Sequence, residues 1–188
     1  SNSFLKLEKN AAACRLCPSL AGETAILSSA NGSLNASIFF IAEAPGRFGA
    51  GRTGVPFQGD RSGDNFEVLL KHIGLMRSEV FITNAVLCNP LIDGNNRRPS
   101  AKEIKNCTSF LKASLDIIHP KVVVTLGTVA LSSINQLFGT RFQLNQNVAQ
   151  SLTMPDFKLF PLYHPSPRVT NWKRPMAQQK KDFRKIPI

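Results

Sequence analysis

The chain has 188 residues, of which 43% are hydrophobic and 19% are charged, a balance that excludes a disordered protein. Lys and Arg number 23 against 12 Asp and Glu, for a formal net charge of +11, and no run of about 18 apolar residues exists to span a membrane. We expect residues 1–188 to form a single domain that binds a polyanion, either nucleic acid or an acidic membrane surface. The alternative is that the basic side chains form a solvated surface that binds no polyanion.

The pattern of apolar residues along the chain predicts alternating strands and helices. Apolar runs predict buried strands at 37–42, 80–87, 121–126 and 158–163, the last weakened by Pro161. Helical spacing and capping signals predict helices at 64–75, 100–118, 128–137 and 171–186, with Pro175 in the first turn of the last helix or just before it. This alternation is typical of an α/β fold, a three-layer sandwich with a central, mostly parallel four-stranded sheet flanked by helices.

Four candidate functional residues lie at or near the ends of the predicted strands. Glu43, Asn84, Gly127 and His164 each lie at or near the carboxyl end of one of them. Ligands of parallel α/β sheets bind outside the carboxyl ends of the strands. We therefore expect these four positions to converge on one site.

The four cysteines form one candidate metal-ligand set: Cys14 and Cys17 in a C-x-x-C, with Cys88 and Cys107 far along the chain. The chain starts without the basic-then-apolar pattern of a signal peptide, so we expect a reducing cytoplasm, where cysteines more often bind metal than form disulfides. Four thiolates suit zinc or an iron–sulfur cluster, and the wide split of the second pair favours the cluster. Four free, buried cysteines remain the alternative. A metal here would be architectural.

Each candidate site residue also has a plain structural reading. Glu43, in a Pro-Gly turn, orients a water molecule or is satisfied by backbone donors. Phe57, in the glycine-rich segment 51–64, stacks on a base or folds onto the core. Asn84 reads the edge of a pyrimidine or caps a turn. His164 stabilises charge on a substrate oxygen, whereas His72 and His119 lie in or at the end of helices and are expected to be structural.

At these residues the sequence resembles the uracil-DNA glycosylase superfamily, in its iron–sulfur branches, families four and five. The resemblance runs from about Cys14 to Ile186 and has four parts in the family's order. They are the cysteine pairs, the turn Glu43-Ala44-Pro45-Gly46, the Pro56-Phe57 loop and the loop His164-Pro165-Ser166. Each part is weak alone, and together they are specific.

The resemblance implies an enzyme that hydrolyses the N-glycosidic bond of uracil in DNA and leaves an abasic site. It implies a [4Fe–4S] cluster on Cys14, Cys17, Cys88 and Cys107, with zinc as the alternative. The roles it implies are water positioning by Glu43, a backbone N–H from Ala44, base stacking by Phe57, base-edge recognition by Asn84, and stabilisation of the departing base by His164. Ser166 would press on the DNA backbone and Arg168 would enter the groove.

The sequence departs from the pattern of family four. Ala42 stands where family four tends to have Gly, and Arg47 and Arg52 occupy a stretch that is usually acidic there. The glycine-rich segment looks instead like family five, so Asp60 competes with Glu43 as the water-directing carboxylate. Family-five-like enzymes also accept purine lesions such as hypoxanthine.

Two other functions remain open at this stage: a non-catalytic nucleic-acid-binding module with a structural metal, and a glycosylase of the same fold specific for another lesion. A metal-dependent hydrolase is disfavoured, because the cysteines use up the plausible ligands. The partner we expect is DNA, single- or double-stranded, bound by a monomer associated with a prokaryote-like nucleoid. The basic residues at or after Arg168 are expected to track phosphates: Arg168, Lys173, Arg174, Lys180, Lys181, Arg184 and Lys185.

Overall fold

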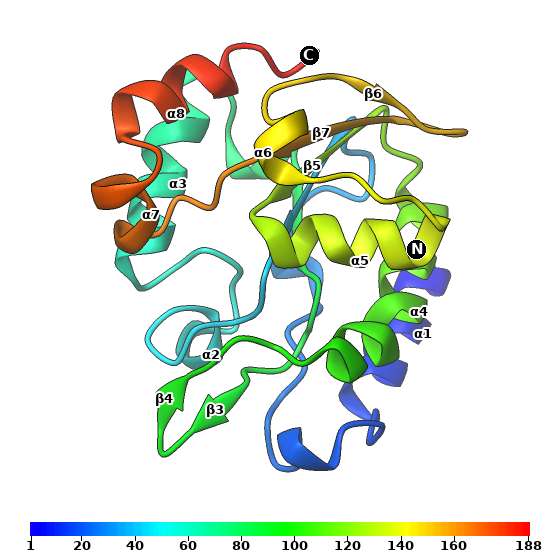
Figure 1. Ribbon diagram of the computed structural model, residues 1–188. Coiled ribbons are helices and arrows are strands. Elements are labelled where there is room, and N and C mark those ends of the chain that lie inside the picture. Colours follow the sequence, from blue (N-terminus) through cyan, green and yellow to red (C-terminus); the bar gives the residue numbers. More distant parts are fainter.

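The computed structural model describes residues 1–188 and is built around one five-stranded sheet with the order β2-β1-β5-β7-β6 (Figure 1). The strands are β1 (Ile38–Ala42), β2 (Phe81–Asn84), β5 (Val122–Leu126), β6 (Leu152–Thr153) and β7 (Lys158–Leu162). Neighbouring strands from β2 to β7 are parallel, and β6 pairs antiparallel with β7. The expected mostly parallel α/β sheet is confirmed.

The predicted strand count of four is wrong by one, and the second strand is shorter than predicted. The missed strand, β6, has two residues, which is too few to produce a readable alternation. Of the run predicted as 80–87, only Phe81–Asn84 forms the strand. The next two residues, Ala85 and Val86, leave the strand conformation but still donate their N–H groups to the carbonyls of Ala42 and Glu43.

The strand order reverses beside β1. The chain passes from β1 to β2 at one edge of the sheet and later returns to the other side of β1 with β5. In the register, Ala42 at the end of β1 pairs with Asn84, and Ile41 pairs with Thr125. Such a switch point opens a crevice at the carboxyl ends of the strands, and the residues after β1, β2, β5 and β7 face it.

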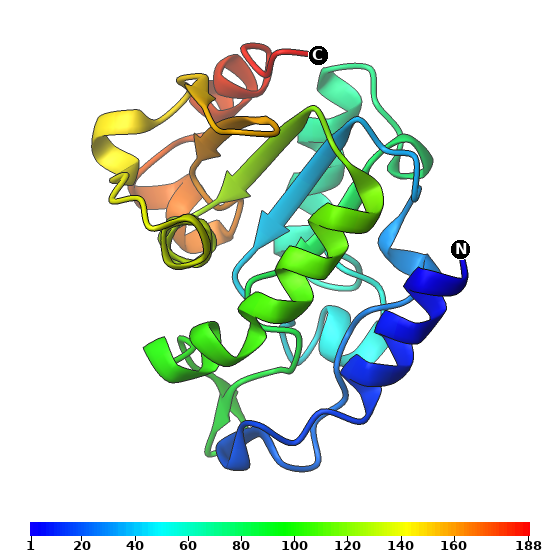
Figure 2. The ribbon, with the colours of Figure 1, turned by 90° about the vertical axis from the view of Figure 1, so that its right-hand side faces the viewer.

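Helices cover both faces of the sheet and complete the three layers (Figure 2). Residues of α1, α4 and α5 share one core cluster, and those of α3 and α8 share a second. Alternate residues of β1 enter different clusters: Phe39 and Ile41 enter the first, and Ile38 and Phe40 the second. Burial on both faces explains why this strand reads as an unbroken apolar run. These helices are α1 (Asn2–Ala12), α3 (Arg61–His72), α4 (Ala101–Ile118), α5 (Thr128–Phe138) and α8 (Met176–Phe183).

The predicted C-terminal helix at 171–186 is right about Pro175, which precedes the helix, but its start is wrong, because the segment holds two helices. They are α7 (Pro167–Trp172) and α8, with Pro175 at the N-cap of the second. Proline disfavours helical conformation in the residue before it and lacks an N–H group, so the chain leaves the helix and starts again. By contrast, the capping box that predicts α4 is present, with Ser100 and Glu103 bonding reciprocally.

Short elements occupy the connections. They are the hairpin β3 (Leu91–Ile92) and β4 (Asn95–Asn96), the single-turn helices α2 (Ala50–Thr53) and α6 (Leu144–Asn147), and the 3₁₀ turns η1 (Pro18–Leu20), η2 (Ser29–Asn31) and η3 (Arg77–Glu79). Sequence patterns predicted none of these, nor α1. None of the helices has both the length and the apolar character needed to cross a membrane.

The outer edge of β2 is closed by one glycine. Gly32 forms an antiparallel bridge with Phe81 and has a φ of +126°, in the region that side chains disfavour. A Cβ atom at Gly32 would lie 2.0 Å from the carbonyl oxygen of Val80. The bridge therefore requires glycine at this position.

Candidate active site

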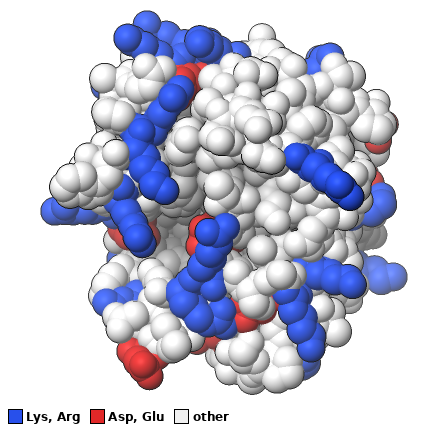
Figure 3. All heavy atoms as spheres, viewed as in Figure 1, with Lys and Arg blue, Asp and Glu red and all other residues white.

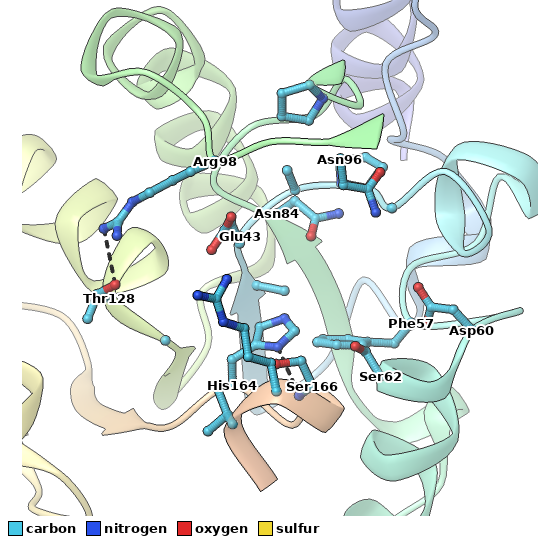
Figure 4. Close-up of a pocket in the computed structure, with 18 of the residues that line it drawn as sticks. Glu43, Phe57, Asp60, Ser62, Asn84, Asn96, Arg98, Thr128, His164 and Ser166 are labelled. Atoms are coloured by element: carbon cyan, nitrogen blue, oxygen red, sulfur yellow. Dashed lines mark hydrogen bonds between the residues drawn. The ribbon is translucent and has the colours of Figure 1, made fainter. Parts of the chain in front are cut away.

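A pocket of about 670 Å³ lies at the carboxyl ends of the parallel strands (Figure 4). The eight residues to which the family resemblance assigns a catalytic or substrate-binding role all line it, although they come from separate segments. They are Glu43, Ala44, Phe57, Asp60, Asn84, His164, Ser166 and Arg168. The fold therefore brings the whole predicted set together.

Asn84 ends β2 with its amide facing the pocket. The residue is only 5% exposed, and its side chain makes no hydrogen bond within the chain. Because the residue lines the pocket, both the donor and the acceptor of its amide are available to a ligand. The alternative of a turn-capping Asn is not what the structure shows, because no turn uses the side chain.

His164 follows β7 and is neutral. Its Nδ1 accepts a hydrogen bond from the N–H group of Ser166 at 3.1 Å, so the proton of the neutral ring is on Nε2. Burial lowers the pKa of His164 to about 4, so the ring carries no charge near pH 7. Gly127 permits this position, because a Cβ there would come within 3.2 Å of the His164 Cβ. His164 thus offers one N–H donor to the pocket.

Two side-chain amides hold the backbone of the His164 loop. Asn65 in α3 donates its Nδ2 to the carbonyl of Pro165 at 2.7 Å. Gln179 in α8, which is 1% exposed, donates its Nε2 to the carbonyl of His164 at 3.3 Å and to that of Arg174 at 3.1 Å. The loop is therefore fixed from both helices on this side of the sheet.

Phe57 belongs both to the core and to the pocket. Its ring stacks on Phe66 with centroids 4.6 Å apart, and it lies 5.5 Å from the ring of His164. Its φ of +52° is strained for a bulky residue, and Arg77 holds the loop by donating to the carbonyls of Pro56 and Phe57. Both sequence interpretations are therefore partly right: the ring packs on the core and also lines the pocket.

The two candidate carboxylates differ in what they already bind. Asp60 is the N-cap of α3, and its Oδ1 accepts from the N–H of Gly63 at 2.9 Å. Glu43 is half-buried and its carboxylate has no hydrogen-bond partner in the chain, so the alternative of a carboxylate satisfied by backbone donors does not hold. Burial raises the pKa of Glu43, and the nearby Arg98 guanidinium partly opposes this.

Sequence reasoning missed a polar bridge at the mouth of the pocket. Arg98 donates to Thr128 Oγ1 at 3.2 Å and links the segment before α4 to the start of α5 (Figure 4). The neighbouring Arg97 forms an ion pair with the buried Glu103 at 2.6 Å. The only sequence signal near Arg98 is the capping box of Ser100 and Glu103, and this local signal carries no information on the contact between Arg98 and Thr128.

Comparison with known proteins places the chain in a family. The model of the uracil DNA glycosylase superfamily matches residues 30–186. The chain belongs to this superfamily. A type-4 uracil-DNA glycosylase of Sulfurisphaera tokodaii is 32% identical over 98% of this chain and 84% of the relative, and one of Thermotoga maritima is 34% identical over 81% and 76%. A type-5 uracil-DNA glycosylase of Pyrobaculum aerophilum is 31% identical over 76% of this chain and 67% of the relative.

The four cysteines of this uracil DNA glycosylase superfamily member are free thiols, close enough to one another to influence each other's ionisation. Burial and the neighbouring Cys14 and Cys17 raise the pKa of Cys88 to about 11, and burial is also the main cause that raises the pKa of Cys107 to about 12. Asn106 Nδ2 lies 3.3 Å from Cys17 Sγ. No three His, Cys, Asp or Glu side chains are arranged as ligands of a single metal ion.

Basic side chains surround the mouth of the superfamily member's pocket. The face in Figure 3 shows Lys and Arg gathered around a hollow, with few acidic side chains outside it. Four cations line the pocket itself: Arg97, Arg98, Arg168 and Lys173. Elsewhere in the basic C-terminal segment, Arg174 pairs with the buried Asp182 at 2.8 Å and Arg184 donates to His72 at 2.8 Å, so these two are engaged within the protein.

Proposed function

We propose that this protein is a DNA glycosylase that hydrolyses the N-glycosidic bond of uracil and leaves an abasic site. The observation that carries the proposal is the unpartnered Asn84 amide, facing a neutral His164 and a ring-stacked Phe57 in one pocket. Family membership and relatives named uracil-DNA glycosylases support the same reaction. A base reaches such a pocket only by flipping out of the DNA stack.

In this scheme the pocket recognises uracil by its face and its edge. The ring of Phe57 covers one face of the flipped base. The Asn84 amide has a donor and an acceptor for the complementary groups of the uracil edge, and a mismatched base would leave this buried amide unpaired. Selectivity among bases thus rests chiefly on Asn84.

The chemistry divides between the sugar and the base. Glu43 orients a water molecule, accepts a proton from it, and stabilises positive charge on the sugar as the glycosidic bond breaks. The electron pair of that bond leaves with the base. The Nε2–H of His164 and the N–H of Ala44, which has no partner within the chain, stabilise the resulting negative charge.

Glu43 is the better of the two candidates for directing the water. Asp60 already accepts a hydrogen bond as the cap of α3, whereas both oxygens of Glu43 are free. A raised pKa also makes Glu43 a stronger base than an ordinary carboxylate.

We further propose that Cys14, Cys17, Cys88 and Cys107 hold a [4Fe–4S] cluster that ties the N-terminal segment to α4. Four neighbouring thiols suit a [4Fe–4S] cluster, in which each cysteine binds a different iron. When bound, the cluster would supply structure and no step of hydrolysis. Iron and sulfide analysis of the purified protein tests this, and one zinc per chain without iron would refute it.

The function is tested with a uracil-containing oligonucleotide, followed by alkali to cleave abasic sites. We expect cleavage at uracil, while an intact oligonucleotide that binds the protein would support the non-catalytic alternative. Parallel substrates with hypoxanthine and xanthine test the third possibility, since preferential release of either would assign the pocket to that lesion.

Three finer points complete the proposal: the enzyme acts as a monomer, in the cytoplasm, on nucleoid DNA. Sedimentation of the protein with and without DNA measures its state, and a stable dimer in both would contradict the proposal.

A further inference from the structure

Only two aromatic side chains of this protein are exposed, and both lie beside the pocket. The chain has 13 Phe, one Tyr and one Trp. All are buried or half-buried except Phe48 and Trp172, whose exposures are 59% and 85%. An exposed aromatic ring keeps a large hydrophobic area in water, so a pair of them at one site indicates a binding surface.

Trp172 lies on the pocket side of α7. Arg168 and Val169, which line the pocket, precede Trp172 by four and three residues and therefore share its helix face. The next residue, Lys173, also lines the pocket. Helix α7 therefore carries the exposed indole next to two cations that line the pocket, Arg168 and Lys173.

Phe48 occupies a similar position in the loop before α2. It lies between Gly46 and Ala50, which both line the pocket. The guanidinium of Arg47 sits over the Phe48 ring, 4.4 Å from its centroid. This loop and α7 reach the pocket from different sides (Figure 4).

We propose that Phe48 and Trp172 form an aromatic rim that stacks on unpaired DNA bases next to the flipped nucleotide. The identity of the central nucleotide rests on the proposed function. Flipping one nucleotide removes a stacking partner from its neighbours, and an exposed ring replaces it. Stacking on aromatic rings tolerates any base, and the adjacent Arg47, Arg168 and Lys173 bind phosphates.

This rim favours single-stranded or locally opened DNA over closed duplex. Bases within a duplex are stacked on one another and present no free face, whereas unpaired bases do. The preference follows from the rim and not from the pocket, so it extends to DNA without uracil.

Trp172 is the only Trp, so its fluorescence reports the contact directly. We expect a uracil-free thymidine oligonucleotide to quench the emission strongly, and the same sequence in a duplex to quench it weakly. Measured by anisotropy of a labelled oligonucleotide, Trp172→Ala and Phe48→Ala should each weaken single-strand binding about tenfold. Trp172→Phe, which retains a ring, should remain close to wild type.

Leu5→Ala is the matched control, because Leu5 is 54% exposed on α1 and does not line the pocket. It should leave binding unchanged. Emission that stays constant while anisotropy shows saturation, or a Trp172→Ala affinity equal to that of the control, would overturn the rim. Emission that changes on dilution without DNA would assign Trp172 to a protein contact instead.

These measurements separate the two proposals. Because the fluorescence experiment uses an oligonucleotide without uracil, it tests the aromatic rim alone. Quenching by this oligonucleotide, together with no uracil release from the uracil-containing oligonucleotide, would keep the rim and remove the proposed function. Uracil release without any change in Trp172 emission would keep the proposed function and remove the rim.

Discussion

Glu43 and Asp60 give opposite expectations for the same type of substitution. Glu43→Gln removes the carboxylate that directs the water, so we expect kcat to fall by about 10²–10⁴ with little change in DNA affinity or melting temperature. Asp60→Asn keeps a competent helix cap and should retain both activity and stability. Single-turnover assays and thermal melts measure this, and loss of activity in Asp60→Asn alone would transfer the role to Asp60.

The base-contacting residues should affect catalysis more than binding. His164→Ala and Asn84→Ala each remove a donor aimed at the flipped base, which is worth about 10²–10³ in kcat. Affinity for uracil-containing DNA should change much less, because phosphate contacts dominate it. Equal losses of rate and affinity would contradict these roles.

The pH dependence should report Glu43. Its raised pKa means that the active carboxylate is lost as pH falls, beginning above the usual range of a glutamate. His164, with a pKa of about 4, stays neutral over this range. Arg98→Met removes a charge that lowers the pKa of Glu43, so the acid limb of kcat/KM should move to higher pH. Arg98→Lys keeps the charge and should leave the limb in place; equal profiles for both variants would refute the coupling.

At the scale of elements, α8 positions the catalytic loop. Gln179→Leu removes the bond from α8 to the His164 carbonyl, so we expect kcat to fall with KM nearly unchanged. The pKa of His164, followed by NMR, should move from about 4 towards its ordinary value as the loop loosens. Gln178→Leu is the control, since Gln178 contacts Asp182 and not the loop. Similar effects of both variants would indicate general loosening of α8.

The elements predictable from sequence are those with a long repeating pattern. The run of β1, buried on both faces, and the capping box of α4 are local signals, and both hold in the structure. The end of α7 at Trp172 was missed because a helical period continues past it, and the two-residue β6 was missed because it is too short to show any period. The rule that ligands bind at the carboxyl ends of parallel strands predicted the position of the pocket. The contacts of Arg98 with Thr128 and of Gln179 with His164 join segments distant in sequence, and no local pattern encodes them.

At the scale of the whole molecule, the distribution of free cations should set the salt dependence of DNA binding. Arg168 and Lys173 line the pocket, whereas Lys6 and Lys9 are exposed on α1 away from it. Neutralising Arg168 and Lys173 should reduce the slope of log K against log salt by about 0.7 for each lost contact with single-stranded DNA. Neutralising Lys6 and Lys9 should not change it, and an equal reduction in both double variants would indicate a diffuse charge effect.

The bridge between Gly32 and β2 protects the protein from aggregation. Every other long strand of the sheet has neighbours on both sides, and β6 ends the opposite edge after two residues. Substituting Gly32 would push its backbone away from Val80 and leave β2 with unpaired N–H and C=O groups, a template for intermolecular strand pairing. Damage at this remote position would therefore appear first as aggregates during expression, while the molecules that stay dispersed retain an intact pocket.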